Sequence, residues 1–391
     1  MTLLQQETYE PLTEETAIQL AKKLNIFNQE ANLVCQEIGD GNLNYVFHIT
    51  DRQNGQSLII KQALPYAKVV GESWPLSLNR ATIEAEALKL FKSLTPNFIP
   101  EVYYTNEALA ITVMEDLSHL TIARSGLIQG ENYPHLANHL GTFLANSLFF
   151  TSDYGLNPIK KKELVAKFIN PDLCKITEDL IFTDPFYDTP TNEFEEELKD
   201  DTQELWEDEP LKLQVALLKK KFLTETEALL HGDLHTGSIF ASYEETKIID
   251  PEFAYFGPAG FDLGQVIANL LFQAIACEQK KEKIFAEIEQ FWNVFQEKFT
   301  HLWNTQSIEP YQHLNGFLQQ LIQKYFKDAI GFAGCEIIRR TIGLAHVADL
   351  DSIETLESKL VAKRRALETG RKLILNHQQY LSIKDVFKDI L

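Results

Sequence analysis

The amino-acid sequence predicts an α+β fold with two lobes, a small lobe built on an antiparallel sheet and a larger lobe that is mainly helical. The chain has 391 residues, which is more than a single hydrophobic core usually organises. Strand-like alternation is concentrated before about residue 117, and helical periodicity prevails after it. With 45% hydrophobic and 11% aromatic residues, the chain can form sizeable cores, which argues against global disorder.

The small lobe is expected to span residues 1–117. Thr13, followed by two glutamates and an apolar face, marks a helix N-terminus. Residues 45–50 and 57–63 alternate like strands around a polar turn and predict a hairpin. The other expected elements are a helix at 80–94 that stops before Pro96, strands at 102–104 and 108–114, and a hinge at Glu115, Asp116 and Leu117.

The larger lobe is expected to span residues 118–391. Its most apolar stretch, residues 263–277, is interrupted by Gly264, Gln265, Asn269 and Gln273. We interpret this stretch as a buried helix, because it is too short and too polar to cross a bilayer. No membrane span is therefore expected. Residues 1–10 have neither a basic n-region nor an apolar h-region, so no secretory signal is expected either.

The formal net charge of −20 limits the partners of the protein. A field of this sign repels nucleic acid and anionic lipid, so neither is expected to bind. It also repels ATP, so a nucleotide site would need its own lysine, main-chain N–H groups and metal. The four cysteines are far apart and form no CxxC pair, which favours reduced thiols in a cytoplasmic protein, although a disulfide stays open: Cys35, Cys174, Cys277 and Cys335.

Two motifs predict phosphoryl transfer, His231–Phe240 (HGDLHTGSIF) and Ile248–Glu252 (IIDPE). Their aspartates, Asp233 and Asp250, are 17 residues apart (250 − 233), which suits two loops that meet at one site. In this chemistry one carboxylate accepts the proton of the attacking hydroxyl and another holds the Mg²⁺ that bridges the phosphates. We expect Asp233 in the first role, and Asp250 with Glu252, on one strand face, in the second.

A different role for these motif residues stays open. The acids could cap helices or turns. His231 and His235 have a spacing that can bind zinc, but the glycines at 232 and 237 favour a loop, in which His231 would orient the chain by hydrogen bonds.

A second group of residues lies in the small lobe. Gly39 and Gly41 precede the first hairpin strand and would let main-chain N–H groups approach phosphate, although a plain hairpin turn would look the same. Lys61 interrupts an apolar strand, and a lysine buried there needs an anion. Glu84 on the next helix is the expected partner, with Glu86 as the alternative. A surface lysine on an edge strand remains the other interpretation.

The order of these features resembles the protein-kinase-like superfamily, and the HGDLH form resembles its small-molecule branch, which includes aminoglycoside and choline kinases. Over essentially its whole length the sequence is similar to the methylthioribose kinase family. Five separate blocks carry the similarity: residues 39–47, 60–66, 71–76, 250–252 and 339–346.

The resemblance implies transfer of the ATP γ-phosphate to the 1-hydroxyl of S-methyl-5-thioribose, in methionine salvage, by a homodimer. It implies ATP contacts from Asn44, Lys61 and the hinge, and binding of Mg²⁺ and phosphate by Asp250 and Glu252. Asp233 would meet the sugar hydroxyl, and Arg339 and Arg340 would touch the substrate or the transferring phosphate.

Two departures from the general kinase pattern fit this family. Ser238 stands five residues after Asp233, where kinases usually carry a metal-binding asparagine, and Asp250-Pro251-Glu252 replaces the usual DFG. We infer that Glu252 supplies the missing metal ligand.

Two details of the acceptor site are less determined. Adjacent residues on a helix differ by about 100°, so Arg339 and Arg340 are not expected to point the same way. One would reach phosphate and the other would hold an acid, unless both are surface residues. Trp74 would either form an apolar wall for the methylthio group or belong to the core.

Two alternative functions stay open. A kinase of an amino alcohol or aminoglycoside would need an acidic pocket, and residues 192–210 carry ten acids and one lysine, although a solvated face would look the same. A non-catalytic scaffold of the same fold is the other, but it has no chemical need for Lys61, Asp233 and Asp250 together.

Overall fold

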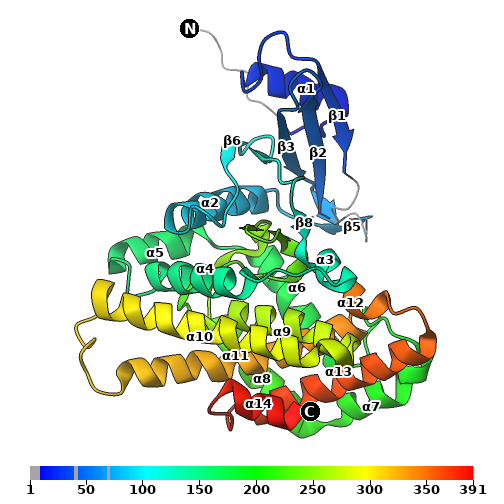
Figure 1. Ribbon diagram of the computed structural model, residues 1–391, viewed down its shortest axis with the longest axis vertical. Coiled ribbons are helices and arrows are strands. Elements are labelled where there is room, and N and C mark those ends of the chain that lie inside the picture. The colour runs from blue at the N-terminus through cyan, green and yellow to red at the C-terminus, as the bar shows by residue number, and fades with distance from the viewer. Residues whose placement is uncertain (1–8, 39–42, 68–70, 391) are drawn as a thin grey trace. The chain divides into compact units, whose positions relative to one another are not determined.

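The computed structural model describes residues 9–38, 43–67 and 71–390 (Figure 1), without the side chains of residues 67 and 71–74. The chain divides into two compact units, one of residues 1–120 with 249–253 and the other of residues 121–248 with 254–391. The predicted α+β class is confirmed, with a small antiparallel sheet in the first unit and mainly helices in the second. The predicted lobe boundary after residue 117 stays a prediction.

The first unit is built on a five-stranded antiparallel sheet with the order β1-β2-β3-β7-β6. The predicted hairpin is confirmed, but β1 had not been recognised because its short run of residues lacks clear alternation. The strands are β1 (Leu33–Glu37), β2 (Asn44–Asp51), β3 (Ser57–Ala63), β6 (Val102–Asn106) and β7 (Ile111–Glu115), with a separate pair of β4 (Tyr66–Ala67) and β5 (Gly71–Pro75).

Two helices complete this unit, and both were predicted. Thr13 caps α1 (Glu14–Lys23) in a reciprocal bond with Thr16, and Ala17 and Ala21 of this helix join the core of the sheet. The second helix, α2 (Asn79–Leu94), ends two residues before Pro96. Lys61 lies on the central strand β3, opposite Val46 of β2 and Thr112 of β7. It is therefore not on an edge strand.

The second unit is mainly helical, as predicted (Figure 1). Its helices are α3 (Ala123–Gln129), α4 (Leu136–Thr151), α5 (Pro158–Lys167), α6 (Pro171–Phe182), α7 (Lys199–Glu207), α8 (Glu209–Thr224), α9 (Gly260–Ala276), α10 (Lys281–Gln306), α11 (Phe317–Ile342), α12 (Ala348–Asp351), α13 (Leu356–Asn376) and α14 (Ile383–Ile390). Short strands form two small sheets: β8 (Thr121–Ile122) with β10 (Ile239–Ala241) and β11 (Thr246–Ile248), and β9 (Ala228–Leu230) with β12 (Tyr255–Gly257).

Helix α9 runs through the core of this unit and packs along α11. It contains the predicted apolar helix at 263–277 except for Cys277, which follows its last residue, and every residue of α9 up to Ile275 is buried. The two helices approach closely where a Cβ added at Gly264 would lie 2.5 Å from the carbonyl oxygen of Ala329 and 3.0 Å from the nitrogen of Ala333. None of the helices in the described part of the chain has the length and apolar character needed to cross a membrane.

The variant Gly264→Ala tests the packing of α9 on α11. We expect it to lower the free energy of unfolding by about 1–3 kcal/mol, because main-chain atoms of α11 cannot rotate away from the new methyl group. This loss should exceed the gain of about 1 kcal/mol in helix propensity. Urea unfolding followed by circular dichroism measures the change. Gln320→Ala, on an exposed position of α11, should leave the unfolding midpoint unchanged, and an unchanged midpoint for Gly264→Ala would contradict the close approach.

Candidate active site

Lys61 of the first unit is held by two carboxylates. Its Nζ donates to Glu84 Oε1 at 2.8 Å and forms an ion pair with Asp250. Burial alone would lower the pKa of Lys61, but Asp250 and Glu84 raise it overall. The expected Lys61–Glu84 pair is confirmed, while the alternative partner Glu86 forms an ion pair with Lys89 on the same helix.

Three carboxylates of this unit gather closely enough to hold a metal ion. Ligand oxygens of Glu84, Asp250 and Glu252 lie within 4.8 Å of one another. Burial raises the pKa of Glu84 to about 7, although Lys61 opposes the shift, and burial together with Asp250 raises the pKa of Glu252. Crowded carboxylates of this kind fit a hard divalent cation, which would relieve their mutual repulsion. The residues present therefore suit Mg²⁺.

The backbone that carries two of these acids is not a strand. Asp250 has φ +69°, and residues Pro251–Phe253 form a single 3₁₀ turn. The prediction that Asp250 and Glu252 share one strand face was wrong, because β11 ends at Ile248, Asp250 is left-handed, and Pro251 then sets the turn. This turn still brings both carboxylates to the same group.

Glu252 is fixed by two neighbours, one of which sequence reasoning missed. Asn44 Nδ2 donates to Glu252 Oε2 at 3.3 Å, and Nε of the buried Arg80 lies 3.3 Å from the same oxygen. Arg80 precedes Glu84 by four residues on α2, so the two side chains share one helix face. That spacing was the available signal. The guanidinium of Arg80 is itself held by the main-chain oxygens of Leu43, Leu64 and Ser77.

The predicted hinge residues brace the end of β7. Glu115 Oε2 accepts a bond from the Glu101 nitrogen at 2.9 Å, and Leu117 is buried. Burial would raise the pKa of Asp116, but bonds from Ser118 and Ser57 lower it overall. The predicted glycines Gly39 and Gly41 lie outside the described residues, as does the side chain of Trp74.

The second unit presents Asp233 on a loop that α9 holds. Asp262 accepts bonds from the His231 nitrogen at 2.7 Å and the Gly232 nitrogen at 3.1 Å. Gln265 Oε1 accepts from the Leu234 nitrogen at 2.7 Å. Gly232 has φ +86°, where a side chain would be strained. Sequence reasoning did not single out Asp262, and it treated Gln265 only as an interruption of an apolar helix.

Two histidines and a serine of the loop bind its own main chain. His231 Nδ1 accepts from the Asp233 nitrogen at 3.3 Å, as expected for an orienting residue. His235 Nδ1 accepts from the nitrogens of Gly237 and Ser238, so its proton is on Nε2, which lies 3.4 Å from Asp233 Oδ2. The Ser238 hydroxyl donates to the His235 carbonyl at 2.8 Å. Among the described residues, the one group of side chains that could hold a metal ion contains no histidine.

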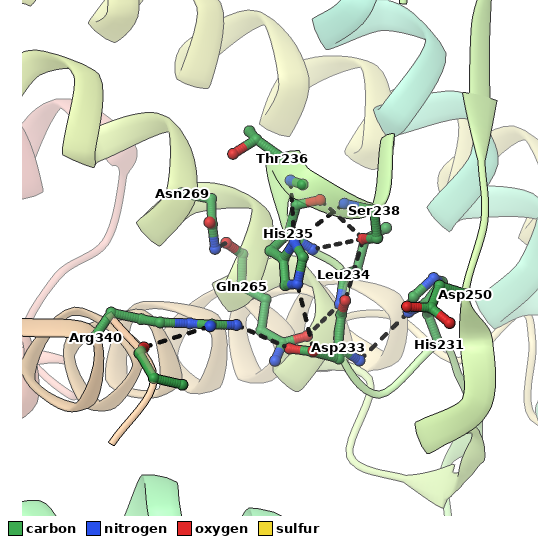
Figure 2. Close-up of polar contacts among 12 residues, drawn as sticks. His231, Asp233, Leu234, His235, Thr236, Ser238, Asp250, Gln265, Asn269 and Arg340 are labelled. Atoms are coloured by element: carbon green, nitrogen blue, oxygen red, sulfur yellow. Dashed lines mark hydrogen bonds and ion pairs between the residues drawn. The ribbon is translucent and has the colours of Figure 1, made fainter. Parts of the chain in front are cut away.

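Asp233 faces two arginines as well as His235. Figure 2 shows His235 and one of the arginines, Arg340, beside it. Its Oδ1 lies 3.4 Å from Arg339 Nη2 and 3.2 Å from Arg340 Nη2. Burial would raise the pKa of Asp233, but His235, Arg340 and Arg339 hold it well below its usual range. Asp233 is therefore ionised at neutral pH.

Both arginines also bind one buried carboxylate, Glu336. Arg339 Nε donates to it at 2.6 Å and Arg340 Nε at 2.9 Å. The expectation that the two arginines would point apart was wrong. Glu336 stands three and four residues before them on α11, so each long side chain curls to the same carboxylate from its own side. Both arginines are buried, which also excludes the surface interpretation.

The acid-rich stretch at 192–210 is attached to the end of α11, which carries these arginines. The Glu193 nitrogen donates to the Ile342 carbonyl at 3.0 Å. His346 contacts the Glu193 carbonyl through Nε2 at 2.6 Å and Asp351 Oδ2 through Nδ1 at 3.1 Å. The buried Lys363 pairs with Glu195 at 2.9 Å. Part of this stretch therefore braces the scaffold.

Comparisons with known proteins place this geometry in a family. Residues 34–293 match the phosphotransferase enzyme family. The chain is 59% identical over 379 residues to a methylthioribose kinase of Geobacillus sp. (strain WCH70), covering 97% of this chain and 95% of the relative. It is 58% identical to a methylthioribose kinase of Bacillus cereus (strain AH820), covering 94% and 93%.

One solved structure has a similar fold at low identity. A choline kinase from Cryptosporidium parvum Iowa II is 14% identical, with a TM-score of 0.50 over 96% of this chain and 100% of that one. The likeness concerns the fold alone, and it agrees with the predicted protein-kinase-like architecture.

The variant His346→Gln tests the attachment of the acid-rich stretch. Burial lowers the pKa of His346, but Asp351 and the Glu193 carbonyl raise it overall, since both ring nitrogens face acceptors. A group whose pKa is raised by folding stabilises the protein below its ordinary value of about 6.5 and loses this effect as the pH rises through the raised value. The variant should therefore lose about 1 kcal/mol of stability at pH 6 and clearly less at pH 8.5.

Chemical denaturation at both pH values measures this difference. His301→Gln, an exposed histidine on α10, makes the same substitution away from these contacts and should behave as wild type. An equal loss for His346→Gln at both pH values would show that the charge of His346 does not hold the stretch.

Proposed function

The chain belongs to the methylthioribose kinase family, within the phosphotransferase enzyme family, and we propose that it transfers the ATP γ-phosphate to the 1-hydroxyl of S-methyl-5-thioribose. The observation that carries the chemistry is an ionised Asp233 beside two buried arginines. A carboxylate of this kind accepts a hydrogen bond from the attacking hydroxyl, and the arginines stabilise charge that develops on the transferring group.

The low pKa of Asp233 limits how it acts as a base. A general base takes a proton early only when its pKa is near that of the donor. Asp233 is far more acidic than a sugar hydroxyl, so it first orients the hydroxyl. It accepts the proton late, when the bond to phosphorus has formed and the oxygen has become acidic. Such timing fits the loose transition state of phosphoryl transfer.

The first unit supplies the nucleotide side of this proposal. Lys61, paired with Glu84, would contact the ATP phosphates, with Asn44, Gly39 and Gly41 beside them, and the hinge from Glu115 to Leu117 would meet the base. Asp250 and Glu252 would hold Mg²⁺, which neutralises phosphate charge when bound. That these residues and Asp233 serve one reaction remains a prediction from the sequence motifs.

The positive charge beside Asp233 favours an uncharged acceptor. An amino alcohol or aminoglycoside would bring its own positive charge toward Arg339 and Arg340, which share the single carboxylate of Glu336 and are therefore only partly neutralised by it. The contacts described for the acid-rich stretch hold the scaffold. Trp74 is proposed as the apolar wall for the methylthio group, and a cytoplasmic homodimer is part of the proposal through the family resemblance.

An acceptor panel tests the function directly. The purified chain is incubated with ATP, Mg²⁺ and either methylthioribose, ribose, choline, homoserine or an aminoglycoside, and ADP release is measured. ³¹P NMR of the product locates the phosphate. We expect a 1-phosphate of methylthioribose and at least about 100-fold lower kcat/KM for the other acceptors. Each lost or added contact weakens binding of the transition state, and every 1.4 kcal/mol of that loss lowers kcat/KM about tenfold. A preference for choline, homoserine or the aminoglycoside would overturn the proposal.

The variant Asp233→Asn tests the role of this carboxylate. We expect kcat to fall about 10²–10⁴-fold, while KM for ATP stays within about twofold, because Asn keeps the shape but cannot accept the proton. Steady-state kinetics measure both constants. Asp200→Asn, an exposed acid on α7, is the matched substitution and should retain full activity. If Asp233→Asn keeps more than about a tenth of kcat, Asp233 is not the base.

The variant Glu252→Gln tests the metal site. We expect it to need several-fold more free Mg²⁺ for half-maximal kcat, because an amide is a weaker ligand than a carboxylate while still accepting from Asn44. The measurement is kcat against free Mg²⁺ at saturating ATP. Glu86→Gln changes an acid on α2 outside the group and should titrate as wild type. Superimposable curves for Glu252→Gln and wild type would remove Glu252 from the ligands.

A further inference from the structure

Helix α9 carries a stripe of buried polar residues that reaches beyond the loop of Asp233. Asp262, Gln265, Asn269 and Gln273 are spaced by three, four and four residues and therefore lie on one helix face. The first two hold the main chain of the loop. Figure 2 shows Gln265 and Asn269 beside this loop. The last two bind a pair of charged side chains that the proposed chemistry does not use.

That pair is Arg124 of α3 and Asp349 of α12. Asn269 Oδ1 accepts from Arg124 Nη2 at 2.7 Å, and Gln273 Nε2 donates to Asp349 Oδ1 at 2.5 Å. Arg124 Nε lies 3.1 Å from Asp349 Oδ2. Arg124 Nε donates its hydrogen to Thr236 Oγ1 at 3.2 Å, so the contact between Arg124 and Asp349 Oδ2 is electrostatic and not a hydrogen bond.

The ionised form of Asp349 depends on the positive charge of Arg124. Its side chain is only 1% exposed, and its Oδ2 has no hydrogen-bond partner among the described residues. Burial raises the pKa of Asp349, whereas Arg124, and more weakly Arg340, oppose the rise. A buried carboxylate that loses its main cation must either take up a proton or attract another cation.

Arg340 is a second cation on this side of the helix pair, since its Nη1 donates to the carbonyl of Ala345, four residues before Asp349, at 3.5 Å. Glu336 and Asp233 raise the pKa of Arg340, and Asp349 raises it to a smaller extent, so the three carboxylates act on the same guanidinium. Arg124 and Arg340 repel each other as well. Burial, and to a smaller extent the positive charge of Arg340, lower the pKa of Arg124 to about 10. The charge of Asp349 therefore acts on Arg340 as well as on Arg124.

We propose that Arg124 is a positioning residue for phosphoryl transfer, because by neutralising Asp349 it leaves Arg340 directed toward Asp233. This inference rests on the proposed kinase function. Without Arg124, the charge of Asp349 draws Arg340 away from Asp233 and from the transferring group. Arg124 lies over the loop as well, since a Cβ at Gly237 would come within 3.1 Å of its Nη1.

A double-mutant cycle tests the inference. Arg124→Met should lower kcat about 10–100-fold with KM for ATP unchanged, as expected when a charged group near a reacting centre is misplaced. Asp349→Asn removes the charge that attracts Arg340. The double variant should therefore recover kcat to within about threefold of Asp349→Asn alone, because coupled residues are not additive. Arg124→Lys, which keeps the positive charge, should retain more kcat than Arg124→Met.

Arg371→Met, an exposed arginine paired with Asp208, is the matched control and should act as wild type. Thermal unfolding by circular dichroism shows which variants fold, and if Arg124→Met does not, the double variant is still compared with Asp349→Asn. A double variant more than about tenfold slower than Asp349→Asn would overturn the inference, since Arg124 would then act independently of Asp349. A wild type inactive on methylthioribose would instead overturn the proposed function.

Discussion

The loop that carries Asp233 depends on α9, because its main-chain N–H groups have no strand to pair with. Buried N–H groups without an acceptor are costly, and a loop in the core has to find acceptors among side chains. Asp262 and Gln265 supply them from a helix that is largely apolar. The same face then reaches Arg124 and Asp349 through Asn269 and Gln273. One helix therefore fixes both the backbone of the loop and the charges around it.

Compensation of buried charge is common to the two units. In the second unit Glu336, 1% exposed, holds Arg339 and Arg340 side by side, although two guanidinium groups repel each other. In the first unit Lys61 and Arg80 offset the carboxylates of Glu84, Asp250 and Glu252. Buried ion pairs add little net stability, so the role of such clusters lies in the chemistry they make possible.

The strongly negative net charge of the chain does not predict the sign of the charge around individual residues. Several acids of the stretch at 192–210 are used in scaffold contacts, with Glu195 on Lys363 and Asp201 on Arg364. Asp233, in contrast, is surrounded by His235, Arg339 and Arg340. Net charge therefore restricts the class of partner, while the few residues near each reacting atom determine what binds there.

Local sequence determined the α+β class, the first hairpin, the capped helix at Thr13 and the chemical residues of the loop, because turn residues, periodicity and short motifs act over a few positions. It also indicated the Lys61–Glu84 pair, since a buried lysine needs an acid. Only the tertiary structure decided that Arg339 and Arg340 share Glu336, that Pro251–Phe253 is a turn, and that Arg80 and Arg124 support the two charge clusters. The arginine contacts join residues far apart in the chain or depend on how long side chains bend, and the turn depends on the left-handed backbone of Asp250, which a residue other than glycine rarely adopts.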